Sequence, residues 1–104
     1  MSYYSEYEKF HVAVDSIIFG YDEGERDLKL LLLKRNFQPA KGEWSLMGGF
    51  LEKEESIDHA AKRILHQLTG LSDVYMEQLY SFGEIDRDPG DRIISIAYFA
   101  LIKI

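Results

Sequence analysis

The most constraining pattern in this sequence is an amphipathic repeat between Ser56 and Gly70, with a helix start signal before it and a stop signal after it. Ser56 is a favourable N-cap residue, and Gly70 stands just past the last apolar position, where helices commonly end. The apolar positions recur at the spacing of one helical face: Ile57, Ala60, Ala61, Ile64, Leu65 and Leu68. The pattern therefore predicts a helix, and the rest of the chain is organised around it.

The segments on either side of this helix are expected to be strands joined by loops. Alternation and β-branched residues indicate the first strand, and the short apolar run after it is expected to be a fully buried strand that pairs with the first as a hairpin. The expected strands cover residues 10–21, 28–33, 43–47, 74–83 and 93–104. Residues 34–42 and 84–92 contain proline and glycine and are expected to be loops.

The chain has 104 residues, which is enough for one domain. Residues 1–9 show no period and are expected to form an N-terminal arm, followed by a domain over residues 10–104. No apolar run approaches the ~18 residues of a membrane span, and no signal peptide is recognisable, so we expect a cytoplasmic protein with no membrane contact. The absence of cysteine excludes disulfides and thiolate metal sites. A net charge of −6 without a basic patch argues against nucleic-acid binding through this segment.

Candidate binding residues lie outside the apolar face of the helix. Lys34 and Arg35 leave an apolar run together, which fits either a solvated strand end or a site for an anionic or hydroxylated ligand. Trp44 stands close to paired glycines, where it fits either a core residue or the floor of a ligand pocket. His59 and His66 are about 10 Å apart on the helix, too far to chelate one metal, so this polar face is expected to be solvated.

The glycine-rich segment and the helix together resemble the Nudix box. The resemblance rests on Gly49, five residues, Glu55, seven residues and Arg63, with Gly70 and Leu71 beyond. It continues upstream through Leu32, Leu33, Lys34, Arg35, Gly42, Trp44, Ser45, Leu46 and Gly48. It covers residues 10–104 and implies an α/β fold, an α/β/α sandwich around a mixed sheet. A Nudix domain usually continues with further strands and a helix, so the resemblance implies a domain truncated at its C-terminal end.

The acidic cluster of the Nudix box is missing. In working family members, acids after the arginine hold Mg²⁺, and by position they fall on Ile64, Gln67 and Leu68. Mg²⁺ requires oxygen ligands, which isoleucine and leucine do not have. The resemblance therefore implies a degenerate box with no catalytic residues and no metal cofactor, which retains Gly49, Glu55 and Arg63.

One branch of the family combines this fold with such a box. The segments 34–50 and 81–92 resemble Nudix-type transcription regulators of Bacteroidetes, of the arabinose-responsive or NAD-metabolism type, in which a winged-helix domain binds DNA. The resemblance implies a homodimer whose Nudix-like domain binds a sugar or nucleotide-sugar effector, such as L-arabinose or ADP-ribose. DNA would be bound by a winged-helix domain that this chain lacks. The expected ligand-binding residues are Lys34, Arg35, Trp44, Glu52, Asp86 and Arg92.

Two alternatives remain open at this point. The first is a Mg²⁺-dependent Nudix hydrolase of ADP-ribose or a similar nucleoside diphosphate, with a displaced metal site built from Glu52, Glu54, Glu55 and acids of residues 84–91. The second is an assembly fragment whose apolar terminal strand pairs with another chain.

Overall fold

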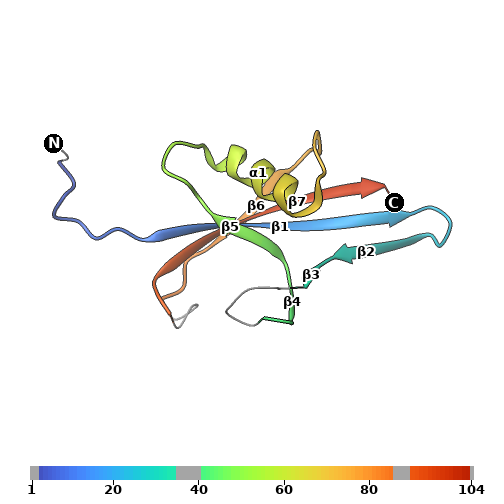
Figure 1. Ribbon diagram of the computed structural model, residues 1–104, viewed down its shortest axis with the longest axis horizontal. Coiled ribbons are helices and arrows are strands. Elements are labelled where there is room, and N and C mark those ends of the chain that lie inside the picture. Colours follow the sequence, from blue (N-terminus) through green and yellow to red (C-terminus); the bar gives the residue numbers. More distant parts are fainter. Residues whose placement is uncertain (1–2, 35–40, 86–89, 104) are drawn as a thin grey trace.

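The structure is a computed structural model that describes residues 3–34, 41–85 and 90–103. It contains a helix, α1 (Ile57–Thr69), and strands in the order shown in Figure 1. The strands are β1 (His11–Asp22), β2 (Asp27–Leu31), β3 (Leu33–Lys34), β4 (Trp44–Ser45), β5 (Met47–Phe50), β6 (Glu77–Phe82) and β7 (Ile93–Lys103).

The main sheet is mixed, as the family resemblance implies, and β1 lies inside it. Its order is β2-β1-β7-β6, and β5 pairs with the first half of β1 on the side where β2 pairs with the second half. The pairing of β1 with β7 is parallel, from His11 beside Ile93 to Tyr21 beside Lys103, whereas the other pairings are antiparallel. A separate two-stranded ladder joins β3 to β4. Helix α1 covers one face of the sheet (Figure 1).

Helix α1 begins and ends where the sequence predicts. The hydroxyl of Ser56 accepts a hydrogen bond from the backbone N–H of His59 at 3.1 Å, which satisfies a donor that the first turn leaves free. Gly70 has a φ of 77°, in the left-handed region that favours glycine, and its N–H donates to the carbonyl of His66 at 2.8 Å. The helix is too short and too polar to cross a membrane.

The core lies between α1 and the facing side of the sheet. Val14 and Tyr98, from β1 and β7, pack against Ala60, Ala61 and Ile64 of the helix. A second cluster further along the helix contains Ile18, Met47, Leu65 and Ala100. The core face is made of the even-numbered residues of β1 and β7 because side chains alternate along a strand.

The prediction of a fully buried strand over residues 28–33 is wrong. The run divides into β2 and β3, and every residue of β2 is exposed, including Leu28 at 53% and Leu30 at 47%. Strand β2 is exposed because it pairs with the end of β1, whereas α1 packs against β1 and β5. No described helix lies over β2.

Candidate functional site

The candidate site contains an ion pair between a glutamate and an arginine, which connects the loop after β5 to the helix. Arg63 donates from Nε to one carboxylate oxygen of Glu55 at 2.9 Å and from a terminal nitrogen to the other at 2.6 Å. The Glu55 side chain is only 7% exposed. A two-point contact of this kind holds both groups in one orientation and is stronger than a neutral hydrogen bond.

Further contacts complete the network around this pair. Arg63 also donates to the carbonyl of Phe50 at 2.9 Å and approaches a carboxylate oxygen of Glu52 at 3.1 Å. The N–H of Glu52 donates to Glu55 at 2.9 Å, and a ring nitrogen of His59 lies 3.0 Å from the same carboxylate. Both ends of the loop between β5 and α1 are therefore attached to Arg63.

The network fixes the charge of Glu55. Hydrogen bonds from Arg63 lower the pKa of Glu55 from its ordinary 4.5 to about 2, against an opposing effect of burial, and the Glu52 N–H and His59 add to the lowering. The same pairing raises the pKa of Arg63. Because its oxygens are occupied by these donors, Glu55 serves to position the loop.

Two of the three positions where the family carries metal-binding acids pack in or against the core instead. Ile64 is 2% exposed and packs with Val14 and Tyr98, while Leu68 packs against both core clusters. A Cβ added at Gly49 would stand 3.1 Å from Ile64, so the side chain fills the space between helix and strand. Gln67 is exposed, and its amide oxygen accepts from Arg63 at 3.2 Å. These residues do not fit a Mg²⁺ ion, which requires a set of oxygen ligands.

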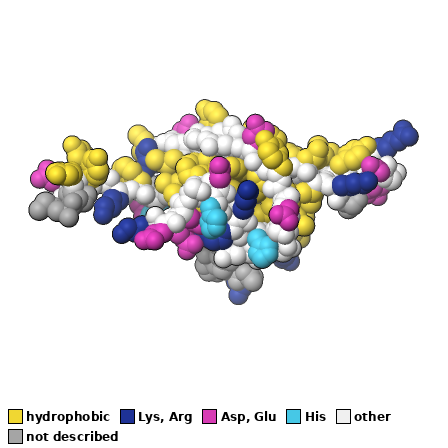
Figure 2. Space-filling view, turned by 90° about the horizontal axis from the view of Figure 1, so that it is seen from above, with side chains coloured by type: hydrophobic (Ala, Val, Ile, Leu, Met, Phe, Trp, Pro, Cys, Tyr) yellow, Lys and Arg dark blue, Asp and Glu magenta, His cyan; other side chains and the backbone are white. Residues whose placement is uncertain are grey.

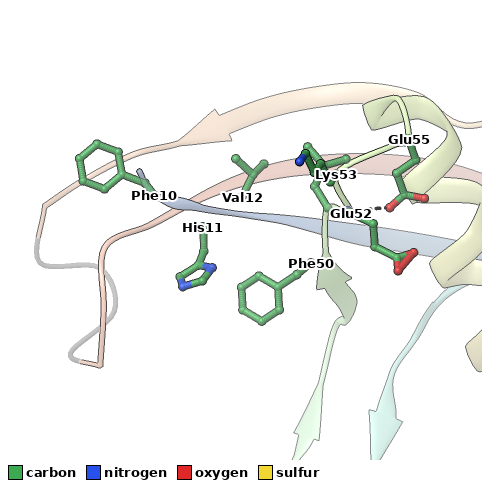
Figure 3. A pocket seen from close by; sticks show the side chains of 8 residues that line it. Phe10, His11, Val12, Phe50, Glu52, Lys53 and Glu55 are labelled. Carbon is green, nitrogen blue, oxygen red and sulfur yellow. Dashed lines mark hydrogen bonds between the residues drawn. The ribbon is translucent and has the colours of Figure 1, made fainter. Parts of the chain in front are cut away.

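A pocket opens beside the loop, at the point where β1 begins. Its cavity volume is about 250 Å³. Two segments line it: residues 10–12, where β1 begins, and residues 50–53 together with Glu55 (Figure 3). Two of its rings, His11 and Phe50, meet edge to face with centroids 5.6 Å apart. Lys53 and Glu52 bring one positive and one negative side chain. Rings and a few charged groups around a concave space are typical of a small-molecule site.

The structure brings the expected ligand residues together only in part. Lys34 and Trp44 pair across β3 and β4, with the ammonium nitrogen 6.0 Å from the ring centroid, but they do not line the pocket. Trp44 is 66% exposed, so it is not a core residue. Glu52 lines the pocket. Arg35 and Asp86 lie outside the described residues.

Arg92 stands next to the pocket through Phe10, one of its lining residues. The guanidinium carbon lies 5.7 Å from the Phe10 ring centroid, and a terminal nitrogen donates to the carbonyl of Gly83 at 3.1 Å. Its Nε atom is buried and has no hydrogen-bond partner. A cation over an aromatic face is attracted to it, which keeps positive charge near this end of the sheet.

Sequence reasoning missed several of the pocket's lining residues. Phe10, His11, Phe50 and Lys53 carry no motif of their own, and they meet only because β5 pairs with the first half of β1. One signal was available. Because β5 is a strand, Phe50 lies on the same face as Gly48, away from the core, and a large ring exposed after a glycine pair indicates a contact surface.

The outer side of α1 is polar, as expected. Charged and histidine side chains gather over the middle of the molecule in the view onto the helix (Figure 2). A polar contact joins the helix to β7: the hydroxyl of Tyr98 donates to the carboxylate of Asp58. Burial, with the Asp58 contact, raises the pKa of Tyr98 to about 12.

Comparison with known proteins extends over nearly the whole chain. A sequence model of the NUDIX domain matches residues 9–103. The ADPR responsive transcriptional repressor NtrR of Acinetobacter baylyi is 39% identical over 101 residues, 95% of this chain and 40% of the repressor. An ADP-ribose pyrophosphatase of Methanocaldococcus jannaschii is 40% identical over 87 residues, 84% of this chain and 48% of the enzyme. The chain thus spans less than half the length of either relative.

A solved structure with the same fold contains a ligand. The NUDIX domain of Shewanella oneidensis NrtR, complexed with ADP ribose, matches with a TM-score of 0.83 and 31% identity, over 94% of this chain and 64% of that one. The names of these three proteins refer to ADP-ribose and not to arabinose, so the arabinose expectation gains no support from them.

Proposed function

This chain belongs to the Nudix domain family, and we propose that within it the chain is a catalytically inactive, ADP-ribose-sensing domain of a transcription repressor. The observation that carries the proposal is the burial of Ile64, whose side chain packs from α1 against Gly49 of β5. It turns the metal-binding face of a Nudix hydrolase into packing surface while the loop network of Glu55 and Arg63 stays intact. The domain keeps a shaped site, and two of its three metal-binding positions, Ile64 and Leu68, carry no oxygen ligand for Mg²⁺-assisted hydrolysis.

The pocket beside the loop is where we place one end of the effector. Its 250 Å³ lies just below the usual size of a whole-ligand pocket, so it suits a single ring system, with the rest of the ligand lying along the loop. The rings of Phe10, His11 and Phe50 offer stacking or edge contacts to a nucleobase. The ligand's phosphates need positive charge on a chain of net charge −6, and Lys53 and Arg92 supply it here.

We propose the following as ligand residues and expect them to contribute unequally to binding: Lys34, Arg35, Trp44, Glu52, Asp86 and Arg92. Glu52 lines the pocket and can accept from a ribose hydroxyl, and Arg92 stands next to it. Lys34 and Trp44 form a second exposed pair, on the other sheet. A DNA-binding domain would lie outside this chain.

Calorimetric titration with ADP-ribose in the presence of EDTA tests the proposal. We expect saturable binding without added metal, weakened at least tenfold by Lys53→Ala. Lys62→Ala, a lysine exposed on the outer side of α1, is the matched control and should bind as the parent does. Absence of binding at any ADP-ribose concentration would overturn the proposal.

The hydrolase alternative is favoured by the 40% identity to an ADP-ribose pyrophosphatase. Its expected acids are constrained, since Glu55 is held by Arg63 and Glu52 approaches the same guanidinium. Release of AMP from ADP-ribose with Mg²⁺ decides between the two functions. Product above a no-enzyme control that disappears in Glu52→Gln or Glu54→Gln would establish a hydrolase and exclude the inactive sensor.

A further inference from the structure

Glu52 lines the pocket, and contacts within the protein hold both its side chain and its backbone. One carboxylate oxygen lies 3.1 Å from Nε of Arg63, and the backbone N–H donates to Glu55 at 2.9 Å. The N–H of Glu55 donates in return to the Glu52 carbonyl at 3.4 Å. The Glu52 side chain is still 66% exposed, which leaves it open to a group in the pocket. A ligand therefore meets a carboxylate whose position is already set.

The negative charge of Glu52 is only partly balanced by its neighbour. Arg63 makes its two-point contact with Glu55, at 2.9 and 2.6 Å, and approaches Glu52 with the same Nε atom. With histidine neutral, one guanidinium beside two carboxylates leaves one negative charge. Glu52 has the more exposed carboxylate, since the Glu55 side chain is 7% exposed. This part of the pocket wall is therefore negative.

The positive side chains near the pocket lie in a different direction. Figure 3 shows the side chain of Lys53 directed toward Val12 and Phe10, and the side chain of Glu52 directed away from them. Arg92 also lies at Phe10, with its guanidinium carbon 5.7 Å from the ring centroid. A bound nucleotide would thus place its phosphates toward Lys53 and Arg92 and a different group against Glu52.

A ribose is the part of a nucleotide that matches a carboxylate. An ionised carboxylate only accepts hydrogen bonds, and the neighbouring 2′- and 3′-hydroxyls of a ribose can each donate one. A phosphate ester on the 2′ position removes a donor and adds negative charge, which the carboxylate repels. Dinucleotide-binding folds use the same chemistry, with an acidic residue at a free 2′-hydroxyl and an arginine at a 2′-phosphate. The 2′ and 5′ substituents leave the ribose in different directions, as do the side chains of Glu52 and Lys53 from their loop.

We propose that Glu52 makes this site specific for a nucleotide whose adenosine ribose has free hydroxyls, and that it disfavours the same nucleotide with a 2′-phosphate. One residue supplies both the attraction and the repulsion, because the acid that accepts from the hydroxyl pair is also the charge that the phosphate meets. The inference rests on the proposed function, since it takes ADP-ribose as the ligand and the pocket as the place of its nucleobase.

Calorimetric titration with ADP-ribose and with 2′-phospho-ADP-ribose, both in EDTA, tests the inference. We expect the parent protein to bind ADP-ribose more tightly by a factor of about ten or more. Glu52→Gln removes the charge and keeps an oxygen that can accept from Arg63, so the preference should fall below about threefold. Glu52→Lys reverses the charge and should reverse the preference. Glu77→Gln, which removes one negative charge at an exposed position of β6, is the matched control and should keep the preference of the parent.

Circular dichroism checks that each variant is folded, and the two Glu52 variants give independent readings of the same charge. A preference that weakens in Glu52→Gln and reverses in Glu52→Lys, but stays in Glu77→Gln, supports the inference. A parent protein that binds both ligands equally tightly overturns it and leaves the proposed function intact. So does a preference that neither Glu52 variant changes. A protein that binds neither ligand overturns the proposed function and this inference together.

Discussion

Gly49 lies against the buried side chain of Ile64, so closely that a Cβ added at position 49 would stand 3.1 Å from both Cδ1 and Cγ1 of the isoleucine. In the Nudix pattern one of these positions supplies a turn glycine and the other a metal-binding acid. Here the two residues form one packing contact between β5 and α1. The same contact leaves little space for a side chain at position 49 and presents no oxygen ligand to Mg²⁺.

Substitution of the glycine should therefore cost stability. Overpacking costs about 1–3 kcal/mol, and a lower entropy of the unfolded chain offsets about 0.4–1 kcal/mol, so Gly49→Ala should lose about 1 kcal/mol in urea unfolding. Gly83→Ala, where an added Cβ meets nothing within 4 Å, is the control. The loss should shrink in an Ile64→Ala background. An equal loss in both backgrounds would mean that the contact is not the cause.

Restoring an acid at the core position should damage the fold and yield no enzyme. Ile64→Glu places a carboxylate in a site that is 2% exposed, at a cost of several kcal/mol, more than the cavity left by Ile64→Ala. Gln67→Glu, at an exposed motif position on the same helix, should change stability by less than about 0.5 kcal/mol. Unfolding curves measure both variants. A stable Ile64→Glu protein that releases AMP with Mg²⁺ would contradict the packing argument.

The charge network around Glu55 predicts loss of stability in acid. The folded pKa of about 2 lies below the ordinary value of 4.5, so the stabilisation is present above pH 4.5 and is lost as the pH falls toward 2. Glu55→Gln should be less stable than the parent at neutral pH and should show a flatter decline below pH 4.5. Melting temperatures from pH 2 to 7 measure this. Glu54→Gln is the control. If the melting temperature of Glu55→Gln fell below pH 4.5 as steeply as that of the parent, the assignment of the pH dependence to Glu55 would be wrong.

Tyr98 predicts a loss of stability in alkali. Its folded pKa of about 12 exceeds the ordinary 10, so its contribution is complete below pH 10 and is lost as the pH rises toward 12. Tyr98→Phe should lose on the order of 1 kcal/mol at neutral pH, through the hydrogen bond to Asp58, and should decline less steeply above pH 10. The difference in absorbance at 295 nm between parent and variant should show one phenol ionising near pH 12. A difference midpoint near pH 10 would contradict this assignment.

The N-cap of α1 gives a local test. Ser56→Ala removes the acceptor for the His59 N–H and should cost about 1 kcal/mol, whereas Ser56→Asp keeps an acceptor and should stay close to the parent. Urea unfolding of the three proteins measures the difference. If Asp and Ala at position 56 were equally destabilising, the cap contact would not be what stabilises this helix end.

Much of the fold could be predicted from local pattern. The ends of α1 follow from Ser56 and Gly70, and β1 and β7 follow from long runs of strand-forming residues. The loss of the metal face at Ile64 and Leu68 is also visible in the sequence. The pocket could not be predicted, because His11 and Phe50 become neighbours only through the pairing of β5 with β1. The pairing of Lys34 with Trp44 likewise depends on the ladder of β3 and β4.

By itself, then, the sequence determined where the helix and most strands lie and that the Nudix box lacks its acids, because caps, period and residue chemistry are local properties. Only the tertiary structure decided what each apolar residue packs against. It placed Ile64 against Gly49 and left Leu28 and Leu30 exposed, although all three of these side chains are aliphatic. The physical reason is that burial depends on which layer covers a strand, and α1 covers β1 and β5 but does not reach β2.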